Sequence, residues 1–187
     1  MMRFVFVLAL VLMFSICAAA QNRAAGPVAQ SNAATQLFAD LCIPAAGNSA
    51  KLNELAERYK LRTVDASFSQ KILKGGPGTV WSASNSLGEF LVISQANNSC
   101  SVWARRADAE TSIQQFKRII TGAERPGLQL KVVDDRDING QGGTYHYLAY
   151  FLSKTGQTKG MYASIGTSTS SAAEVQVRLR LLPAKSE

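Results

Sequence analysis

The sequence predicts an α+β protein, built on an antiparallel sheet of about six to seven strands. Two helices precede the sheet strands and one helix is inserted after the third strand. The first observation behind this is a change in apolar spacing, from a helical period to an alternating one, after Gly75–Gly78. The second is that the alternating segments are joined by short polar turns, which favour antiparallel neighbours. The third is a composition of 47% hydrophobic and 18% charged residues, which excludes a disordered chain.

The first twenty residues have the pattern of a secretory signal peptide. A short basic start, Met1–Arg3, precedes the apolar run Phe4–Ile16, and Ala18–Ala20 supplies the small residues of a cleavage site after Ala20. The apolar run is too short to cross a bilayer as a helix, which disfavours the alternative of a membrane anchor. The other alternative is a lipoprotein acylated at Cys17, where Ile16 stands in place of the small residue that a lipobox requires.

Cleavage after Ala20 changes the counts that matter for chemistry. The net charge falls from +7 to +6 because Arg3 is lost, and Cys42 and Cys100 remain of three cysteines. A pair of cysteines in an exported chain predicts one disulfide, and the alternative is two buried free thiols. The bond would close a loop of 59 residues, counted from 42 through 100, and stabilise the fold by about 4 kcal/mol. We therefore expect a periplasmic or secreted protein with no transmembrane segment after cleavage.

Residues 32–187 are expected to form one domain, preceded by a flexible N-terminal arm at 21–31. The first helix begins at Asn32, a capping residue, and ends at Pro44. Its apolar face comprises Leu37, Phe38, Leu41 and Cys42. A second helix begins after Ser49, and its apolar face comprises Leu52, Leu55, Ala56 and Tyr59. Residues 63–74 fit neither period, so no element is predicted there.

The remaining segments alternate as strands, apart from one helix at 108–121 that Asp108 caps and Gly122 ends. The predicted strands are 79–83, 89–94, 99–105, 128–133, 144–153, 161–165 and 174–181. In the last strand, the inward residues are Val175, Val177, Leu179 and Leu181. Its outward residues are Glu174, Gln176, Arg178 and Arg180.

The third strand carries a candidate binding face. Cys100 shares one side of the strand with Val102 and Ala104, whereas Trp103 and Arg105 lie on the other side. If Cys100 bonds to Cys42, the first helix packs on the Cys100 side, and Trp103 and Arg105 point away from it. An aromatic ring beside a guanidinium can hold a partner. The alternative is that the helix at 108–121 covers Trp103, or that the sheet is strongly curved.

Basic residues extend this candidate face. The predicted binding residues are Trp103, Arg105, Arg106, Lys117, Arg178 and Arg180. Their charge favours an acidic protein or an anionic envelope polymer as partner. Nucleic acid is not expected, because no RNA-binding or helix-turn-helix pattern is present. The alternative is that the positive charge only keeps the protein soluble.

Residues 135–140 match the first half of a calcium loop. Asp135, Asp137 and Asn139 have the spacing at which oxygen ligands converge in an EF-hand, with Gly140 at the turn. However, the twelfth position is His146 instead of glutamate, and both flanks alternate like strands. A hairpin is therefore favoured, with the calcium site as an alternative and no metal assigned.

No catalytic set accompanies the single histidine, His146. One histidine excludes any multi-histidine metal site, and the chain lacks both a nucleophile elbow and a CxxC pair. A general base also needs a nucleophile and an orienting group, and neither is evident near His146. We therefore expect no cofactor, and a small hydrolase with His146 as base is the third functional hypothesis.

Several short motifs resemble a group of small uncharacterised exported proteins and lipoproteins of proteobacteria, which carries no assigned activity. They are Leu37-Phe38 followed by Cys42, Gly78-Thr79-Val80-Trp81, the segment 90–94 and the segment 100–105. The resemblance covers most of the chain after the signal. It implies a location in the bacterial envelope and a Cys42–Cys100 pair.

The leading functional hypothesis is a non-enzymatic exported protein. It would bind another envelope protein or neutralise a secreted toxin, as an immunity protein does. The alternative is a binder of a small ligand or an anionic envelope polymer through the face that carries Trp103 and Arg105.

Overall fold

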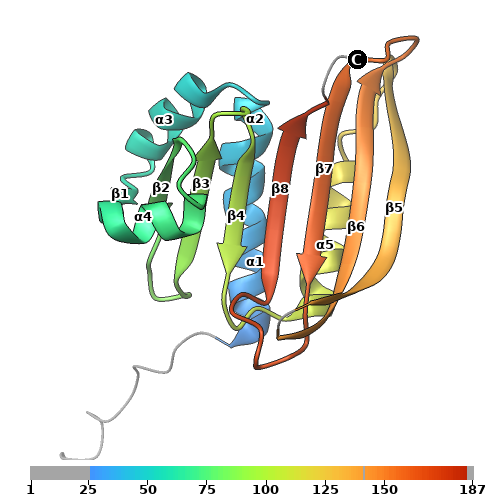
Figure 1. The fold of residues 1–187 in the computed structure, drawn as a ribbon. Coiled ribbons are helices and arrows are strands. Elements are labelled where there is room, and N and C mark those ends of the chain that lie inside the picture. Colours follow the sequence, from blue (N-terminus) through green and yellow to red (C-terminus); the bar gives the residue numbers. More distant parts are fainter. Residues whose placement is uncertain (1–25, 141, 185–187) are drawn as a thin grey trace, which may run out of the picture.

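The computed structural model describes residues 26–140 and 142–184. They form one antiparallel sheet in the order β1-β2-β3-β4-β8-β7-β6-β5, with helices on both faces (Figure 1). This confirms the α+β class and the antiparallel sheet. The proposed signal peptide and residues 21–25 lie outside the described residues. The strands are β1 (Arg62–Thr63), β2 (Gly78–Ser82), β3 (Phe90–Gln95), β4 (Cys100–Ala104), β5 (Leu128–Gly140), β6 (Gly143–Lys154), β7 (Gly160–Thr167) and β8 (Val177–Pro183).

The sheet has eight strands instead of six or seven. β5, β6 and β7 are longer than predicted, whereas β8 begins at Val177 instead of Glu174 and ends at Pro183 instead of Leu181. The additional strand, β1, has only two residues, too few to produce an alternating pattern. β5 and β6 extend the predicted segments 128–133 and 144–153 into a long hairpin. Their added residues are mostly exposed and polar, so a hydrophobic period could not reveal them.

The N-terminal helix begins earlier than Asn32. Helix α1 (Pro27–Leu37) starts at a proline in its first turn and buries Gln30 and Ser31. The Ser31 hydroxyl donates to the carbonyl of Asp108 at 2.9 Å. Residues 27–31 therefore belong to the folded domain and not to a flexible arm. The sequence pattern missed this turn because its buried side chains are polar.

Pro44 does not end this helix, contrary to prediction. The π-helical turn η1 (Phe38–Cys42) follows α1 directly, and α2 (Ile43–Ala45) continues through Pro44. A proline ring collides with the carbonyl four residues earlier in a regular α-helix, and a wider π turn relieves that collision. The helix ends instead at Ala45, because the next residue, Ala46, has a left-handed backbone.

Helix α3 (Ser49–Arg58) matches the second predicted helix. Asn48 caps it by accepting a hydrogen bond from the Lys51 amide, and Leu52, Leu55 and Ala56 are buried. Tyr59 is 44% exposed, although it was expected on the apolar face. The helix ends at Arg58, so the chain has already turned away from the core at Tyr59.

The region without a prediction contains helix α4 (Ala66–Leu73), which Asp65 caps. Leu73 packs with Val80 and Ile93 in a small hydrophobic cluster that is separate from the main core. α4 therefore lies on the opposite face of the sheet from the other helices, over β2 and β3 (Figure 1). Eight residues with one buried side chain leave little periodic signal.

Helix α5 (Ala109–Thr121) and the N-terminal helices cover the other face and enclose the main core. Asp108 caps α5 as predicted, and Phe116 and Ile120 are buried. The ring of Phe116 lies between those of Phe38 and Tyr150, at centroid distances of 6.1 and 6.0 Å. Figure 1 shows α1 and α5 behind the sheet, with α4 in front.

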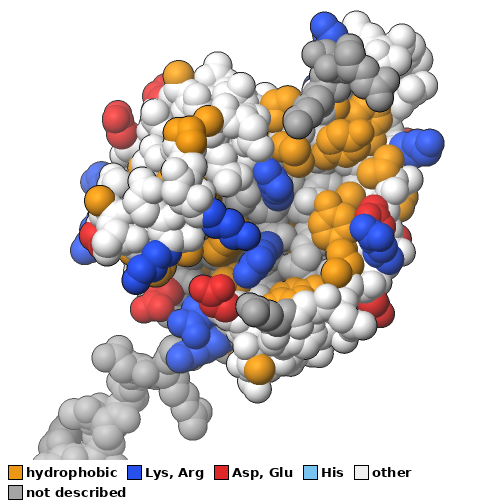
Figure 2. Space-filling model, viewed as in Figure 1, with side chains coloured by type: hydrophobic (Ala, Val, Ile, Leu, Met, Phe, Trp, Pro, Cys, Tyr) orange, Lys and Arg blue, Asp and Glu red, His pale blue; other side chains and the backbone are white. Residues whose placement is uncertain are grey.

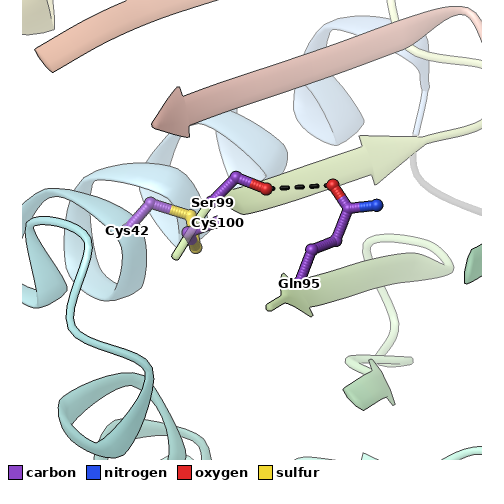
Figure 3. The surroundings of a disulfide bond; sticks show 4 residues. All are labelled: Cys42, Gln95, Ser99 and Cys100. Carbon is purple, nitrogen blue, oxygen red and sulfur yellow. Dashed lines mark hydrogen bonds between the residues drawn. A yellow bond between two sulfur atoms is a disulfide. The ribbon is translucent and has the colours of Figure 1, made fainter. Parts of the chain in front are cut away.

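A disulfide between Cys42 and Cys100 joins η1 to β4, with 5.4 Å between the Cα atoms. Both cysteines are buried (Figure 3). Beside the bond, the Ser99 hydroxyl donates to Gln95 Oε1 at 2.9 Å, which joins β3 to the start of β4. The predicted pairing is confirmed, and it places the N-terminal helix on the Cys100 side of the sheet. Among the described residues, no helix is long and apolar enough to cross a membrane.

Candidate functional site

The face of the sheet opposite Cys100, called the open face here, carries Trp103. β4 pairs with β8 so that Trp103 lies opposite Arg178, and Ser101 lies opposite Arg180. Side chains alternate along each strand, so these four residues share the open face. The Arg178 guanidinium carbon lies 4.6 Å from the centroid of the Trp103 ring, a cation–π contact. α5 is on the other face, so it does not cover Trp103.

A groove of about 530 Å³ lies over these residues, and we call it the arginine groove. Its floor is formed by the small residues Ser101, Ser164 and Gly166, which leave room above the sheet. Gly166 lies between Tyr147 and Arg178 in the strand register. The remaining lining residues are Ile72, Leu73, Lys74, Gln95, Trp103, Ile138, Tyr145, Tyr147, Arg178, Leu179 and Arg180. Figure 2 shows Lys and Arg side chains around the hollow in the middle of this face, beside hydrophobic side chains.

The charge of the arginine groove is one-sided. Arg178, Arg180 and Lys74 line it, whereas no acidic side chain does among the described lining residues. The Arg178 guanidinium has an ion-pair contact with Glu174 at 3.9 Å, but the Glu174 side chain is 76% exposed. An ion pair with so long a distance and so exposed a carboxylate contributes little to the stability of the fold.

Both arginines retain hydrogen-bonding capacity. The Arg180 terminal nitrogen donates to Gln95 Oε1 and Ser99 Oγ, each at a long 3.4 Å. The Nε atoms of Arg178 and Arg180 are buried and have no hydrogen-bond partner among the described residues. A buried donor without a partner costs free energy.

A second depression of about 320 Å³ adjoins the arginine groove, and we call it the apolar pocket. Ile72 and Trp103 line both. Its other lining residues are Val64, Phe68, Ser82, Ser84, Glu89, Phe90, Leu91, Arg105, Glu174 and Val175. Its acidic residues distinguish it from the arginine groove.

The structure brings some of the predicted binding residues together and separates others. Trp103, Arg178 and Arg180 line one groove, and Arg105 lies at the adjoining apolar pocket. Arg106 has a left-handed backbone, with φ of 58°, and lines a different depression near the start of α5. Lys117 lies on α5, on the opposite side of the sheet.

Lys74, Tyr145, Tyr147 and Ile138 also line the groove but were not predicted as site residues. Strand alternation could have placed Tyr145 and Tyr147 on the face opposite His146, because the strand at 144–153 was recognised. Lys74 gave no such signal, since it follows a helix that the sequence pattern did not reveal. Ile138 lies in the part of β5 beyond the predicted strand.

His146 lies on the face of the sheet that α1 and α5 cover, in contact with acidic residues of β5. Its Nδ1 is 3.0 Å from Asp137 Oδ1, and its Nε2 is 3.3 Å from Asp135 Oδ1. Both imidazole nitrogens of His146 thus face carboxylates in the described structure. On the same face of β6, burial, and then the nearby Asp135 carboxylate, raise the pKa of the Tyr150 hydroxyl.

Asp135, Asp137 and Asn139 do not form a calcium-binding loop, because all three lie along β5 in register with β6. Asn139 pairs with Thr144, and its side chain accepts a hydrogen bond from the Thr144 hydroxyl. No group of three or more His, Cys, Asp and Glu residues is arranged to hold a metal ion in the described part of the chain.

Comparison with known proteins adds no assignment. No protein-family model matches the chain, and the search of curated proteins finds no match either.

Proposed function

We propose that this protein is an exported, non-enzymatic binding protein that holds a small anionic ligand in the arginine groove. The observation that carries the proposal is the pair Arg178 and Arg180, whose Nε donors have no described partner, beside the half-buried Trp103. Arginine is suited to this role because its planar guanidinium can form two parallel hydrogen bonds to one carboxylate or phosphate.

The groove surroundings strengthen such a contact. Its floor of Ser101, Ser164 and Gly166 lets an anion approach both guanidiniums, while Trp103 and the tyrosines supply apolar area. No acidic residue is described in the lining, and the only described carboxylate paired with Arg178 is that of the exposed Glu174, at a long 3.9 Å, so an anion in the groove would compete with little. Ion pairs in a partly enclosed groove are also screened less by salt than those on an open surface.

Binding is favoured over catalysis by the composition of the groove. Its described lining contains serine, lysine and tyrosine side chains, but no histidine, aspartate or glutamate that would activate a serine as a nucleophile, and no cysteine. The proposed location is the periplasm or the extracellular medium, supported by the Cys42–Cys100 disulfide and the signal-like N-terminal sequence.

The test is calorimetric titration of the oxidised chain, from Gln21 to Glu187, with 2-naphthoate, a rigid aromatic carboxylate. We expect saturable binding. Arg178→Met and Arg180→Met should each weaken it about tenfold to a hundredfold, because each removes a charged hydrogen-bond donor. Arg118→Met, a matched change on α5, should leave the affinity unchanged.

A second variant tests the location without altering charge. A Cβ at Gly166 would meet no atom within 4 Å, so Gly166→Val should fold normally and fill the groove floor. We expect this variant to lose naphthoate binding while keeping its melting temperature. Equal affinity for naphthoate in the native protein, Gly166→Val and the two arginine variants would contradict the proposal.

A protein partner is the second candidate function, which includes the envelope protein or secreted toxin of the leading sequence hypothesis. It is supported by three aliphatic side chains exposed on edge strand β5: Val132, Val133 and Ile138, at 49, 44 and 40%. In-cell cross-linking from position 133 tests it. A defined partner whose cross-link disappears in Val132→Asp supports this function, and cross-links to the general protein background alone oppose it.

A further inference from the structure

The arginine groove and the apolar pocket adjoin at the edge of α4. Ile72 and Trp103 belong to the lining of both depressions, so these two side chains lie at the boundary between them. A ligand longer than its anionic group would reach the apolar pocket by passing over this boundary. Trp103 would then contact the ligand at the boundary between them.

The two ends of this combined site differ in chemistry. Arg178, Arg180 and Lys74 line one end without a described acidic neighbour in the lining. The other end is mainly apolar, and its lining includes two acidic residues, Glu89 and Glu174, and one basic residue, Arg105. Charge complementarity thus favours one direction, because three basic residues attract an anionic group to the first end more strongly than the mixed charges of the second end do.

We infer that the ligand is a free single-chain amphiphile with an anionic head, such as an alkyl carboxylate. This inference rests on the proposed function and specifies its ligand class. The head lies on Arg178 and Arg180, and the alkyl chain passes Trp103 and lies against α4 in the apolar pocket.

Helix α4 is suited to cover such a chain. Leu73 is its one buried residue in the described structure, whereas Phe68, on the pocket side, is 40% exposed. An exposed aromatic side chain at an apolar pocket gains burial when an alkyl chain occupies that pocket. Lys74 and Gly75 directly follow α4 and both have positive φ, a backbone conformation that ends the helix at Leu73.

The test is a chain-length series of probes, from hexanoate through octanoate and decanoate to dodecanoate, titrated below their micelle concentrations. Complete burial of one methylene raises affinity about fourfold. Because the pocket is open on one side, we expect each added methylene to raise affinity at least about twofold until the pocket is filled. Dodecanol, which has the same chain without the charge, should bind at least about tenfold more weakly than dodecanoate.

Variants of the apolar pocket should affect the long probes alone. Phe68→Ala removes a wall of the pocket, and Ser84→Trp at an exposed position obstructs it. Both should reduce the difference in affinity between dodecanoate and hexanoate while leaving naphthoate binding unchanged. The matched control is Leu87→Ala, because Leu87 is 41% exposed but lines neither depression.

The outcomes separate this inference from the proposed function. Naphthoate and hexanoate binding without any gain from chain length would overturn the amphiphile inference and leave the anion site standing. No binding of naphthoate or of any carboxylate would overturn both. Binding to vesicles that contain anionic lipid, without binding of free dodecanoate, would also overturn the assignment of a free amphiphile.

Discussion

Asp108 connects helix α5 to helix α1 through two hydrogen bonds. Its carboxylate accepts a hydrogen bond from the Thr111 amide at 2.8 Å, which caps α5. Its carbonyl accepts a hydrogen bond from Ser31 of α1. The capping role could be predicted from sequence, because an acidic residue directly before an amphipathic helix is a local signal. The contact with Ser31 could not, since 77 residues separate the two along the chain.

Asp108→Ala should lower the free energy of unfolding by about 1 kcal/mol, the usual cost of a lost helix cap. Hydrogen bonds from Thr111 hold the pKa of the Asp108 carboxyl below its ordinary value. Its contribution is therefore present above the unfolded-state pKa and is lost as pH falls through the folded-state pKa. Urea denaturation at pH 7 and at about pH 3 measures both effects.

Asp108→Asn is the control, because asparagine caps helices but does not titrate near pH 4. The difference in stability between the native protein and Asp108→Asn should therefore vary with pH only through the Asp108 carboxyl. A loss of stability in Asp108→Ala that is unchanged between pH 7 and pH 3 would contradict the role assigned to the ionised carboxylate.

At the scale of elements, the disulfide determines which face the N-terminal helix covers. It ties η1 to β4, so α1 and η1 lie on the Cys100 side and Trp103 lies on the open face. The pairing and this consequence could be predicted from two cysteines in a chain whose sequence predicts export. Helix α4 could not, because its few apolar residues contact a small separate cluster. The π turn η1 could not be predicted either, because it depends on how the N-terminal helix accommodates the ring of Pro44.

Removing the disulfide should weaken the whole fold. The paired variant Cys42→Ala with Cys100→Ala should lower the free energy of unfolding by about 4 kcal/mol, because the unfolded chain loses a constraint over 58 residues of separation. Guanidinium denaturation of the oxidised protein and the variant measures it. Cys17 lies before the proposed cleavage site, so a chain starting at Gln21 has no other thiol. Equal unfolding midpoints for the oxidised protein and the variant would show that the disulfide does not stabilise the fold.

At the scale of the whole molecule, sheet order creates the candidate site. The last strand, β8, lies in the middle of the sheet between β4 and β7, so Arg178 and Arg180 lie beside Trp103. The outward direction of both arginines follows from alternation in β8 and could be predicted. Their position next to β4 depends on long-range strand pairing, which no local pattern contains. For the same reason, Lys117 was grouped with residues from which the sheet separates it.

The central claim is that the arginine groove binds an anionic ligand, and side-chain NMR tests it most directly. Titration with 2-naphthoate is followed at the Nε–H signals of Arg178 and Arg180 and at the indole N–H signals of Trp103 and Trp81. Trp81 is buried in the main core and serves as an internal reference. We predict saturable shifts for both arginines and Trp103 with little change at Trp81. Saturable shifts confined to residues outside the groove, or none at all, would contradict the account.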